Sequence, residues 1–220
     1  MNPVILNVAT GPYVRGQERL QRTIPAGVDF LCWRDEMPPG SPRHGSVPYA
    51  FKAHAILEAR LRGYELILWV DASILPVASL GPLWAQVERD GYWICRNGWQ
   101  NAEWTCDAAY AELGVTREQN WQIPHVVATA FALDMRHEIG RECADQYLRL
   151  AQTRVFCGPW TNKHGEASAD PRVLGHRHDQ TALSVIAWAT GMRLTDAPRI
   201  FAYRQTPRHP ETILEANGTY

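Results

Sequence analysis

An uninterrupted apolar run, Leu66-Ile67-Leu68-Trp69-Val70, is followed at once by the polar turn Asp71-Ala72-Ser73. Strands with continuous hydrophobic sequences are buried on both faces, as in the parallel sheets of α/β proteins. Open sheets of this kind bind ligands in the crevice beyond the carboxyl ends of their strands. Asp71 is therefore a candidate site residue, although a carboxylate at this position can also serve only to cap the turn.

The segments before this run predict alternating strands and helices. The expected elements, in order, are a strand at 4–8, a helix at 15–22, a strand at 28–33 and a helix that ends at residue 62. Ser46 is the expected cap of the second helix, and Pro48 is expected to open it. A β-α-β-α-β order implies parallel strands joined by right-handed crossovers.

The second half of the chain has a less regular pattern. We expect helices at 82–89, 135–154 and 179–190, and strands at 92–95, 126–133 and 200–203. The polar segment from Cys157 to Arg177 has no periodicity, and a loop of this length is typical of a lid or of a mobile insertion. Residues 1–220 are expected to form a single α/β domain, with a mostly parallel central sheet flanked by helices.

The composition argues against several classes of partner and compartment. Lys and Arg total 22 against 23 Asp and Glu, and this balance argues against a nucleic-acid-binding surface. No apolar stretch approaches the roughly 20 residues of a membrane span, and the N-terminus lacks the basic segment of a signal peptide. The five cysteines form no CxxC pair and no zinc-like group with histidine, which favours free thiols in a reducing compartment. We therefore expect a cytoplasmic protein.

Several common catalytic motifs are absent from the sequence, namely the Walker sequence, GxGxxG, GxSxG and HExxH. The polar groups of interest that remain are Asp71, Lys52 and the cluster His176-Arg177-His178-Asp179-Gln180. Asp179 at a helix start has two interpretations. It is either an N-cap that contributes about 1 kcal/mol, or an active-site carboxylate that acts as a general base or holds a sugar hydroxyl. His176 and His178 are more typical of exposed loop histidines than of metal ligands.

Three blocks of the sequence resemble the glycosyltransferases of the GT-A fold. The blocks are Pro48-Tyr49-Ala50-Phe51-Lys52 with Ile56-Leu57-Glu58-Ala59, then residues 63–73, and then His178-Asp179-Gln180-Thr181-Ala182-Leu183-Ser184. The first two resemble the donor-binding half of these enzymes, and the third resembles the carboxylate motif that they place at a helix start. The likeness extends from Pro3 to Tyr203 and includes the small sugar transferases of large viruses and of capsular polysaccharide loci.

By this resemblance, Asp71-Ala72-Ser73 stands at the DxD motif, which in the family contacts the donor ribose and a divalent cation on the diphosphate. Ser73 stands where the motif has its second Asp. Because Mg²⁺ and Mn²⁺ favour carboxylate oxygens, this difference weakens the expected metal site. The metal ligands that the resemblance implies are Asp71 and, for the C-terminal histidine of the family, His209.

The same resemblance implies the remaining parts of the site. The donor-binding residues would be Ala9, Thr10 and Gly11 at the base and ribose, Lys52 at the diphosphate, and Asp71 with Ser73. Asp179 would be the catalytic base of an inverting reaction, or would position the donor sugar in a retaining one. Trp99 and Trp104 can present ring faces to an acceptor glycan.

The expected function is the transfer of a sugar from a nucleoside diphosphate sugar to a hydroxyl of a glycan or glycoconjugate, as in polysaccharide biosynthesis. A sugar-nucleotide pyrophosphorylase is one alternative, but such enzymes have a Gly-rich N-terminal loop that ends in arginine and lysine. The segment Ala9-Thr10-Gly11-Pro12-Tyr13 does not match that loop. A degenerate, non-catalytic module that binds a glycan or a nucleotide is the second alternative, and Ser73 is compatible with it.

Overall fold

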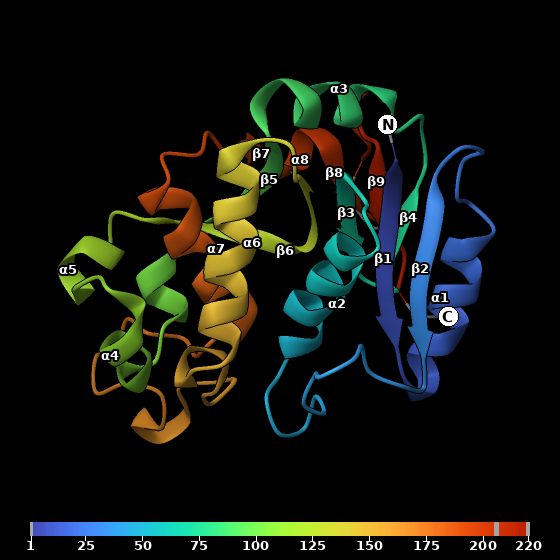
Figure 1. Cartoon of the computed structure of the whole chain (residues 1–220). Helices are drawn as coiled ribbons and strands as arrows, with labels where there is room; N and C mark the ends of the chain where they lie inside the picture. Colours follow the sequence, from blue (N-terminus) through green and yellow to red (C-terminus); the bar gives the residue numbers. More distant parts are fainter. Residues whose placement is uncertain (1, 205–206, 219–220) are drawn as a thin grey trace.

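The computed structural model describes residues 2–204 and 207–218, which form an α/β domain with two sheets (Figure 1). The central sheet has the strand order β2 (Asp29–Arg34), β1 (Pro3–Ala9), β3 (Leu66–Val70), β6 (Pro124–Asp134), β5 (Tyr92–Gln100) and β7 (Thr195–Asp196). The small sheet has the order β4 (Ile74–Pro76), β9 (Leu214–Ala216) and β8 (Phe201–Tyr203).

The helices connect and cover these strands. They are α1 (Val14–Gln21), α2 (Ala50–Leu61), α3 (Gly81–Asp90), α4 (Tyr110–Leu113), α5 (Arg117–Asn120), α6 (Glu138–Ala151), α7 (His178–Ala189) and α8 (Ala197–Ile200). Short 3-10 helices are η1 (Gly11–Tyr13), η2 (Asn101–Trp104), η3 (Asp107–Ala109), η4 (Arg154–Phe156) and η5 (Lys163–Gly165). None of the helices described in residues 2–204 and 207–218 is long and apolar enough to cross a membrane.

The strand pairings are mixed but mostly parallel. β1 pairs in parallel with β2 and β3, and β5 pairs in parallel with β7. β6 is antiparallel to both of its neighbours, β3 and β5. The predicted α/β fold, with a mostly parallel central sheet flanked by helices, is confirmed.

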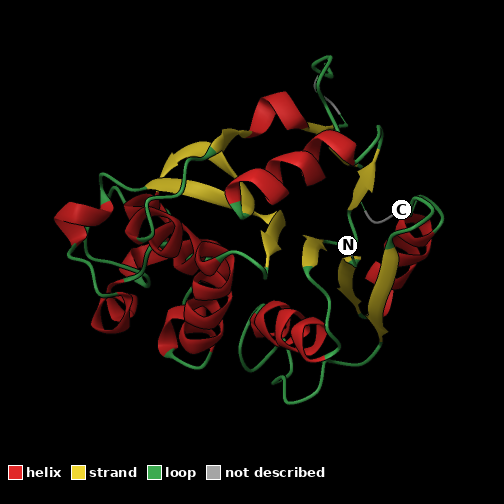
Figure 2. Cartoon of the chain, turned by 45° about the horizontal axis from the view of Figure 1, so that its top comes forward, coloured by secondary structure: helices red, strands yellow, loops and turns green. Residues whose placement is uncertain are grey.

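Helices lie on both sides of the central sheet (Figure 2). Buried residues of α2, α6 and α7 pack on one face, and those of α1 and α3 pack on the other. The side chains of β3 divide between them: Ile67 and Trp69 join the first cluster, and Leu66, Leu68 and Val70 join the second. This two-sided burial is the physical reason for the continuous apolar run.

The start of α2 differs from the prediction. The helix begins at Ala50 after Tyr49, which has a φ of 61°, in the left-handed region. The predicted cap at Ser46 and the predicted opening at Pro48 were therefore wrong. A non-glycine residue with such a backbone angle is strained, and strain of this kind persists only where surrounding contacts hold it in place.

The segment from Cys157 to Arg177 is tied to the domain by backbone hydrogen bonds. Leu174 N–H donates to the Glu103 carbonyl at 2.7 Å, and Arg177 N–H donates to the Trp104 carbonyl at 3.1 Å. His176 N–H donates to the Pro159 carbonyl at 2.9 Å, within the segment itself. The two hydrogen bonds to η2 tie the end of this segment to the rest of the domain, and its expected role as a lid stays a prediction.

The last part of the chain completes the small sheet. The predicted strand at 200–203 is present as β8, and the segment after it adds β9, which the sequence pattern did not indicate. β9 runs antiparallel to β4, so it lies beside the residues that follow Asp71-Ala72-Ser73. All five cysteines are free, as the sequence predicted.

Candidate active site

Asp71 lies directly beyond the carboxyl end of β3, where the sheet predicts a ligand site. Its backbone N–H donates to the Thr129 carbonyl at 2.8 Å, and its Oδ1 accepts from Trp69 Nε1 at 2.7 Å. These contacts fix the turn and the side chain. The side chain remains 24% exposed, and Oδ2 has no hydrogen-bond or ion-pair partner among the described residues. Oδ1 is therefore held by contacts within the protein, and Oδ2 is available to a ligand.

A buried polar network and a close helix contact support this strand end. Asn7 Nδ2 donates to the Val70 carbonyl at 2.6 Å, and Gln17 Nε2 donates to Asn7 Oδ1 at 2.8 Å. A Cβ atom at Gly16 would lie 2.2 Å from the Ala72 carbonyl oxygen. Only glycine therefore lets α1 pack directly on the Asp71 turn, and the site residues stand on rigid elements.

Lys52, from the first turn of α2, lies between two carboxylates. Its Nζ is 2.8 Å from Asp179 Oδ2 and 3.2 Å from Asp71 Oδ1, and it donates to the Ala128 carbonyl at 2.7 Å. The contact with the Ala128 carbonyl is a hydrogen bond, whereas the two carboxylate contacts are ion pairs. We refer to Lys52, Asp71 and Asp179 as the ionic hub.

The hub has an excess of negative charge, because one ammonium faces two carboxylates. Burial acts to lower the pKa of Lys52, but Asp179 and Asp71 outweigh it and raise that pKa above its ordinary value. Burial raises the pKa of Asp179 and of Asp71, and the Lys52 charge opposes this rise at both. Lys52 is the counter-ion of buried Asp179 and of partly exposed Asp71.

The structure places both Lys52 and Asp179 in the interior of the domain. Lys52 is 1% exposed, and its Nζ lies among the two carboxylates and the Ala128 carbonyl; its expected contact with a donor diphosphate stays a prediction. Asp179 is the second residue of α7, with Arg177 at the N-cap position, so Asp179 is not the cap. Its carboxylate is buried against Lys52, and its expected role as a base or as a group that positions the donor sugar stays a prediction.

We expect Asp179→Asn to lower the free energy of unfolding by about 1–3 kcal/mol, because a charged partner of buried Lys52 is lost. The sequence alone predicted a loss of turnover with little change in stability. Urea denaturation and steady-state kinetics on the same preparation distinguish the two. Unchanged stability together with a loss of turnover would return Asp179 to the role of general base.

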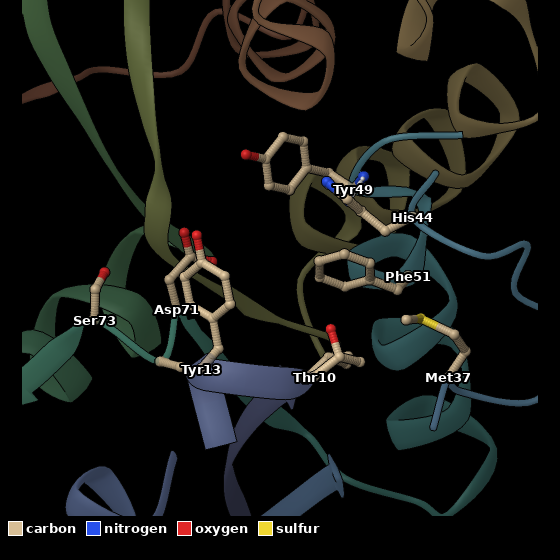
Figure 3. A pocket seen from close by; sticks show the side chains of 10 residues that line it. Thr10, Tyr13, Met37, His44, Tyr49, Phe51, Asp71 and Ser73 are labelled. Carbon is tan, nitrogen blue, oxygen red and sulfur yellow. Dashed lines mark hydrogen bonds between the residues drawn. The ribbon is translucent and has the colours of Figure 1, made fainter. Parts of the chain in front are cut away.

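A cavity of about 270 Å³ opens beside Asp71 (Figure 3). Asp71, Ser73 and Tyr13 line one side, and Tyr49 and Phe51 line the other. Val8, Thr10, Met37, His44 and Ala72 complete the lining. We call this space the first cavity; it combines aromatic walls with a carboxylate and hydroxyl groups.

Predicted donor residues lie in and around the first cavity. Thr10, Asp71 and Ser73 line it, whereas Ala9 is buried and neither Ala9 nor Gly11 is part of the lining. Gly11 N–H donates to Asp35 Oδ1 at 2.8 Å. Ala9 and Gly11 therefore shape the loop that presents Thr10.

A second cavity of about 200 Å³ contains both predicted acceptor residues, Trp99 and Trp104. The other lining residues are Asn97, His125, Val127, Thr129, Arg177, Gln180 and Tyr203. Trp99 is 46% exposed and meets Trp104 edge-on, with the ring centroids 5.7 Å apart. Trp104 is covered by the Arg177 guanidinium at 3.9 Å, so Trp99 offers the more accessible ring.

The residues present do not fit a divalent cation site built by the protein. Residues 2–204 and 207–218 hold no group of three His, Cys, Asp or Glu side chains that could bind a metal. His209 is exposed in the turn before β9, and its Nδ1 accepts from Glu211 N–H at 3.2 Å. The opposite end of β9 is the one near the site, where Asn217 N–H donates to the Ser73 carbonyl. The structure therefore does not bring His209 to Asp71.

Sequence reasoning missed several residues of both cavities. Tyr13 and Tyr49 were not singled out, and His125 lay inside a strand pattern that gives no sign of a cavity. Arg177 was noted only as part of a polar cluster. A tyrosine between Pro48 and a helix gives only a weak indication of a binding site. The left-handed backbone angle that turns Tyr49 toward Lys52 cannot be inferred from residue type.

No protein-family model matches the sequence, and no curated protein matches it. Solved structures do match. A glycosyltransferase involved in glycosylation of the major capsid of PBCV-1 is 12% identical, with a TM-score of 0.55 over 98% of this chain and 92% of that one. Mouse xyloside xylosyltransferase 1, in its apo form, is 10% identical, with a TM-score of 0.56 over 98% of this chain and 97% of that one.

At these identities the likeness concerns the fold. It extends over nearly the whole of each chain, and it agrees with the resemblance seen in the sequence around Asp71 and Asp179. The chain therefore has the GT-A fold of nucleotide-sugar glycosyltransferases.

Proposed function

We propose that the protein is a glycosyltransferase that moves a sugar from a nucleoside diphosphate sugar to a hydroxyl of a glycan or glycoconjugate. One observation carries the proposal: a lining residue of the first cavity is hydrogen-bonded to a lining residue of the second at the carboxyl end of β3. Asp71 lines the first cavity, and its N–H donates to the carbonyl of Thr129, which lines the second. A donor in one cavity and an acceptor in the other would lie on neighbouring strand ends, and group transfer requires that the two reactants be held close together.

In this proposal the first cavity takes the nucleotide. The rings of Tyr13 and Tyr49 supply aromatic faces for a base, and the hydroxyls of Thr10 and Ser73 supply hydrogen bonds for ribose or phosphate oxygens. The open Oδ2 of Asp71 accepts a hydrogen bond from a hydroxyl of the donor. Pockets for small molecules commonly combine apolar walls with a few fixed polar groups in this way.

The reaction breaks the bond between the anomeric carbon and the β-phosphate oxygen, and forms a bond from that carbon to the acceptor oxygen. The nucleoside diphosphate leaves with the bonding electrons, and a β-phosphate oxygen of this leaving group takes the proton of the acceptor hydroxyl. The ionic hub holds Asp71 at the wall of the first cavity, so the protein contributes position and fixed charge.

A thermal-shift screen against nucleoside diphosphate sugars tests the donor assignment. A ligand that binds only the folded state raises its stability by an amount set by the ligand concentration relative to Kd. We expect a concentration-dependent increase in Tm with at least one donor, and a smaller increase with the matching nucleoside monophosphate. An unchanged Tm across the panel would contradict the assignment.

We expect the transfer to depend only weakly on a divalent cation, because Ser73 replaces the second carboxylate and the described residues offer no other ligand set. Enzyme dialysed against EDTA should retain most of its activity, and added Mn²⁺ should change it little. Complete loss with EDTA and recovery with Mn²⁺ would contradict this prediction. A Mn²⁺-soaked crystal would then identify the ligands.

A further inference from the structure

Arg177 carries a charge that no described carboxylate balances. Its guanidinium carbon lies 3.9 Å from the centroid of Trp104 and 5.9 Å from that of Trp160. Its Nη1 donates to the Trp160 carbonyl at 2.7 Å and to the His176 carbonyl at 3.3 Å. These contacts fix the plane of the guanidinium, and the side chain lines the second cavity.

A second arginine in the same segment, Arg172, has both an aromatic contact and a carboxylate that balances its charge. Arg172 lies over Trp121, with its guanidinium carbon 4.4 Å from the ring centroid. Its Nη2 donates to Asp170 Oδ2 at 2.7 Å, so the charge has an internal partner. Arg177 has an equivalent aromatic contact, but among residues 2–204 and 207–218 no Asp or Glu forms an ion pair with it.

His125 supplies an independent sign of a ligand in the same cavity. Asn101 Nδ2 donates to Asn120 Oδ1 at 2.8 Å and to the Thr181 carbonyl, so Asn101 Oδ1 is the acceptor that faces His125 Nδ1 at 2.8 Å. The Nδ1 atom of His125 therefore carries the proton. Burial, and then the Arg177 charge, lower the pKa of His125 to about 3, so the ring is neutral.

The Nε2 atom of His125 is then a bare acceptor. The residue is 1% exposed, it lines the second cavity, and Nε2 has no hydrogen-bond partner among the described residues. Leaving a buried acceptor unmatched costs free energy. A ligand hydroxyl that donates to Nε2 removes that cost.

We propose that the second cavity binds an acidic sugar of the acceptor, with its anionic group on Arg177, a hydroxyl on His125 Nε2 and its ring against Trp99. This inference rests on the proposed transferase function and adds the chemical class of the acceptor. The planar fork of an arginine matches the two oxygens of a carboxylate or a phosphate. A neutral sugar would leave the Arg177 charge unbalanced.

The anionic group has two chemical sources within the acceptor, a carboxylate or a phosphate ester. A third source is the diphosphate of the donor, which the geometry disfavours. Arg177 lines the cavity with Trp99 and Trp104, and it is not part of the cavity with Ser73 and Tyr13. Binding experiments with matched probes distinguish these three sources of the anionic group.

Binding of matched probes is measured by NMR, through the indole N–H signals of Trp99 and Trp104. The probes are methyl β-glucuronide, methyl β-glucoside and glucose 6-phosphate, and they are added to the wild type, Arg177→Gln and Arg172→Gln. We expect at least one acidic probe to bind the wild type about tenfold or more tightly than the neutral glucoside, since hydrogen bonds to charged groups are the stronger ones. The stronger acidic probe identifies the source. The preference should vanish in Arg177→Gln and persist in Arg172→Gln.

Equal binding of the three probes to the wild type overturns the proposal, as does an undiminished acid preference in Arg177→Gln. A parallel titration with a nucleoside diphosphate tests the third source: weaker binding in Arg177→Gln than in Arg172→Gln would assign Arg177 to the donor and also overturn it. Failure of the proposed function is distinguishable, because it appears as absence of donor binding and turnover in the wild type, whatever the acidic probes do.

Discussion

Lys52→Met should lower the free energy of unfolding by about 3–5 kcal/mol, the usual cost of removing one partner from a buried ion pair. Methionine fills a similar volume, so the effect comes from the carboxylates of buried Asp179 and partly exposed Asp71, which are left without a counter-ion, and not from a cavity. Lys163→Met is the matched control, because Lys163 is the only other lysine of the sequence and lies exposed in η5. It should change stability little.

The cost of Lys52→Met should depend on pH. The pKa values of Asp71 and Asp179 are raised in the fold, so the stability they contribute falls as the pH rises through those values. The Lys52 charge keeps the pKa values of Asp71 and Asp179 from rising further, so both pKa values should be higher in the variant. Because the pKa of Lys52 is raised, the stability that its charge contributes is fully present at any pH below the ordinary pKa of lysine. The stability difference between variant and wild type should therefore be larger near pH 8 than near pH 5.

Urea denaturation at both pH values, with circular dichroism as the signal, measures this difference. A pH-independent loss would mean that Lys52 acts through packing alone. A loss below about 1 kcal/mol would show that the two carboxylates are not charged and buried together, since such a small cost is typical of exposed pairs.

Asp71→Asn should reduce transfer by about 10²- to 10³-fold, the range expected when a fixed polar group at the reacting centre is lost. Asparagine retains an oxygen that can accept from Trp69 Nε1, so the turn should keep its shape. The variant loses the negative charge that faces Lys52 and the carboxylate oxygen that is open to the first cavity. We expect the loss in kcat, with the fold intact by circular dichroism.

Asp145→Asn is the control for this variant, because Asp145 forms an exposed ion pair with Arg60 and lines neither cavity. It should retain full activity. Turnover of Asp71→Asn within a few-fold of the wild type would remove Asp71 from the site. A stability loss of about 1 kcal/mol with full activity would show that Asp71 only caps the turn.

The first half of the fold could be predicted from the sequence because its strands and helices have clear local patterns. β1, α1, β2 and β3 lie close to the expected ranges, and their parallel pairing follows from the alternation of strands and helices. The place of β6 could not be predicted. Its pattern indicates a strand, but the antiparallel pairing with both β3 and β5 depends on the chain between them.

The site could be predicted in part for the same reason. Asp71 and Asp179 stand out because each lies at the end of a well-patterned element. Lys52 was expected at the donor diphosphate, and nothing local indicates that it lies 2.8 Å from a carboxylate 127 positions later in the chain. His209 was chosen by resemblance alone, and the turn before β9 holds it away from Asp71.

The most direct test of the central claim is ³¹P NMR of wild-type protein incubated with a panel of nucleoside diphosphate sugars, with and without acceptor sugars. The account predicts release of the free nucleoside diphosphate from at least one donor, faster when an acceptor is present. Asp71→Asn should release far less. Donor binding without any release, in the presence of the whole acceptor panel, would contradict the account and show a non-catalytic binding module.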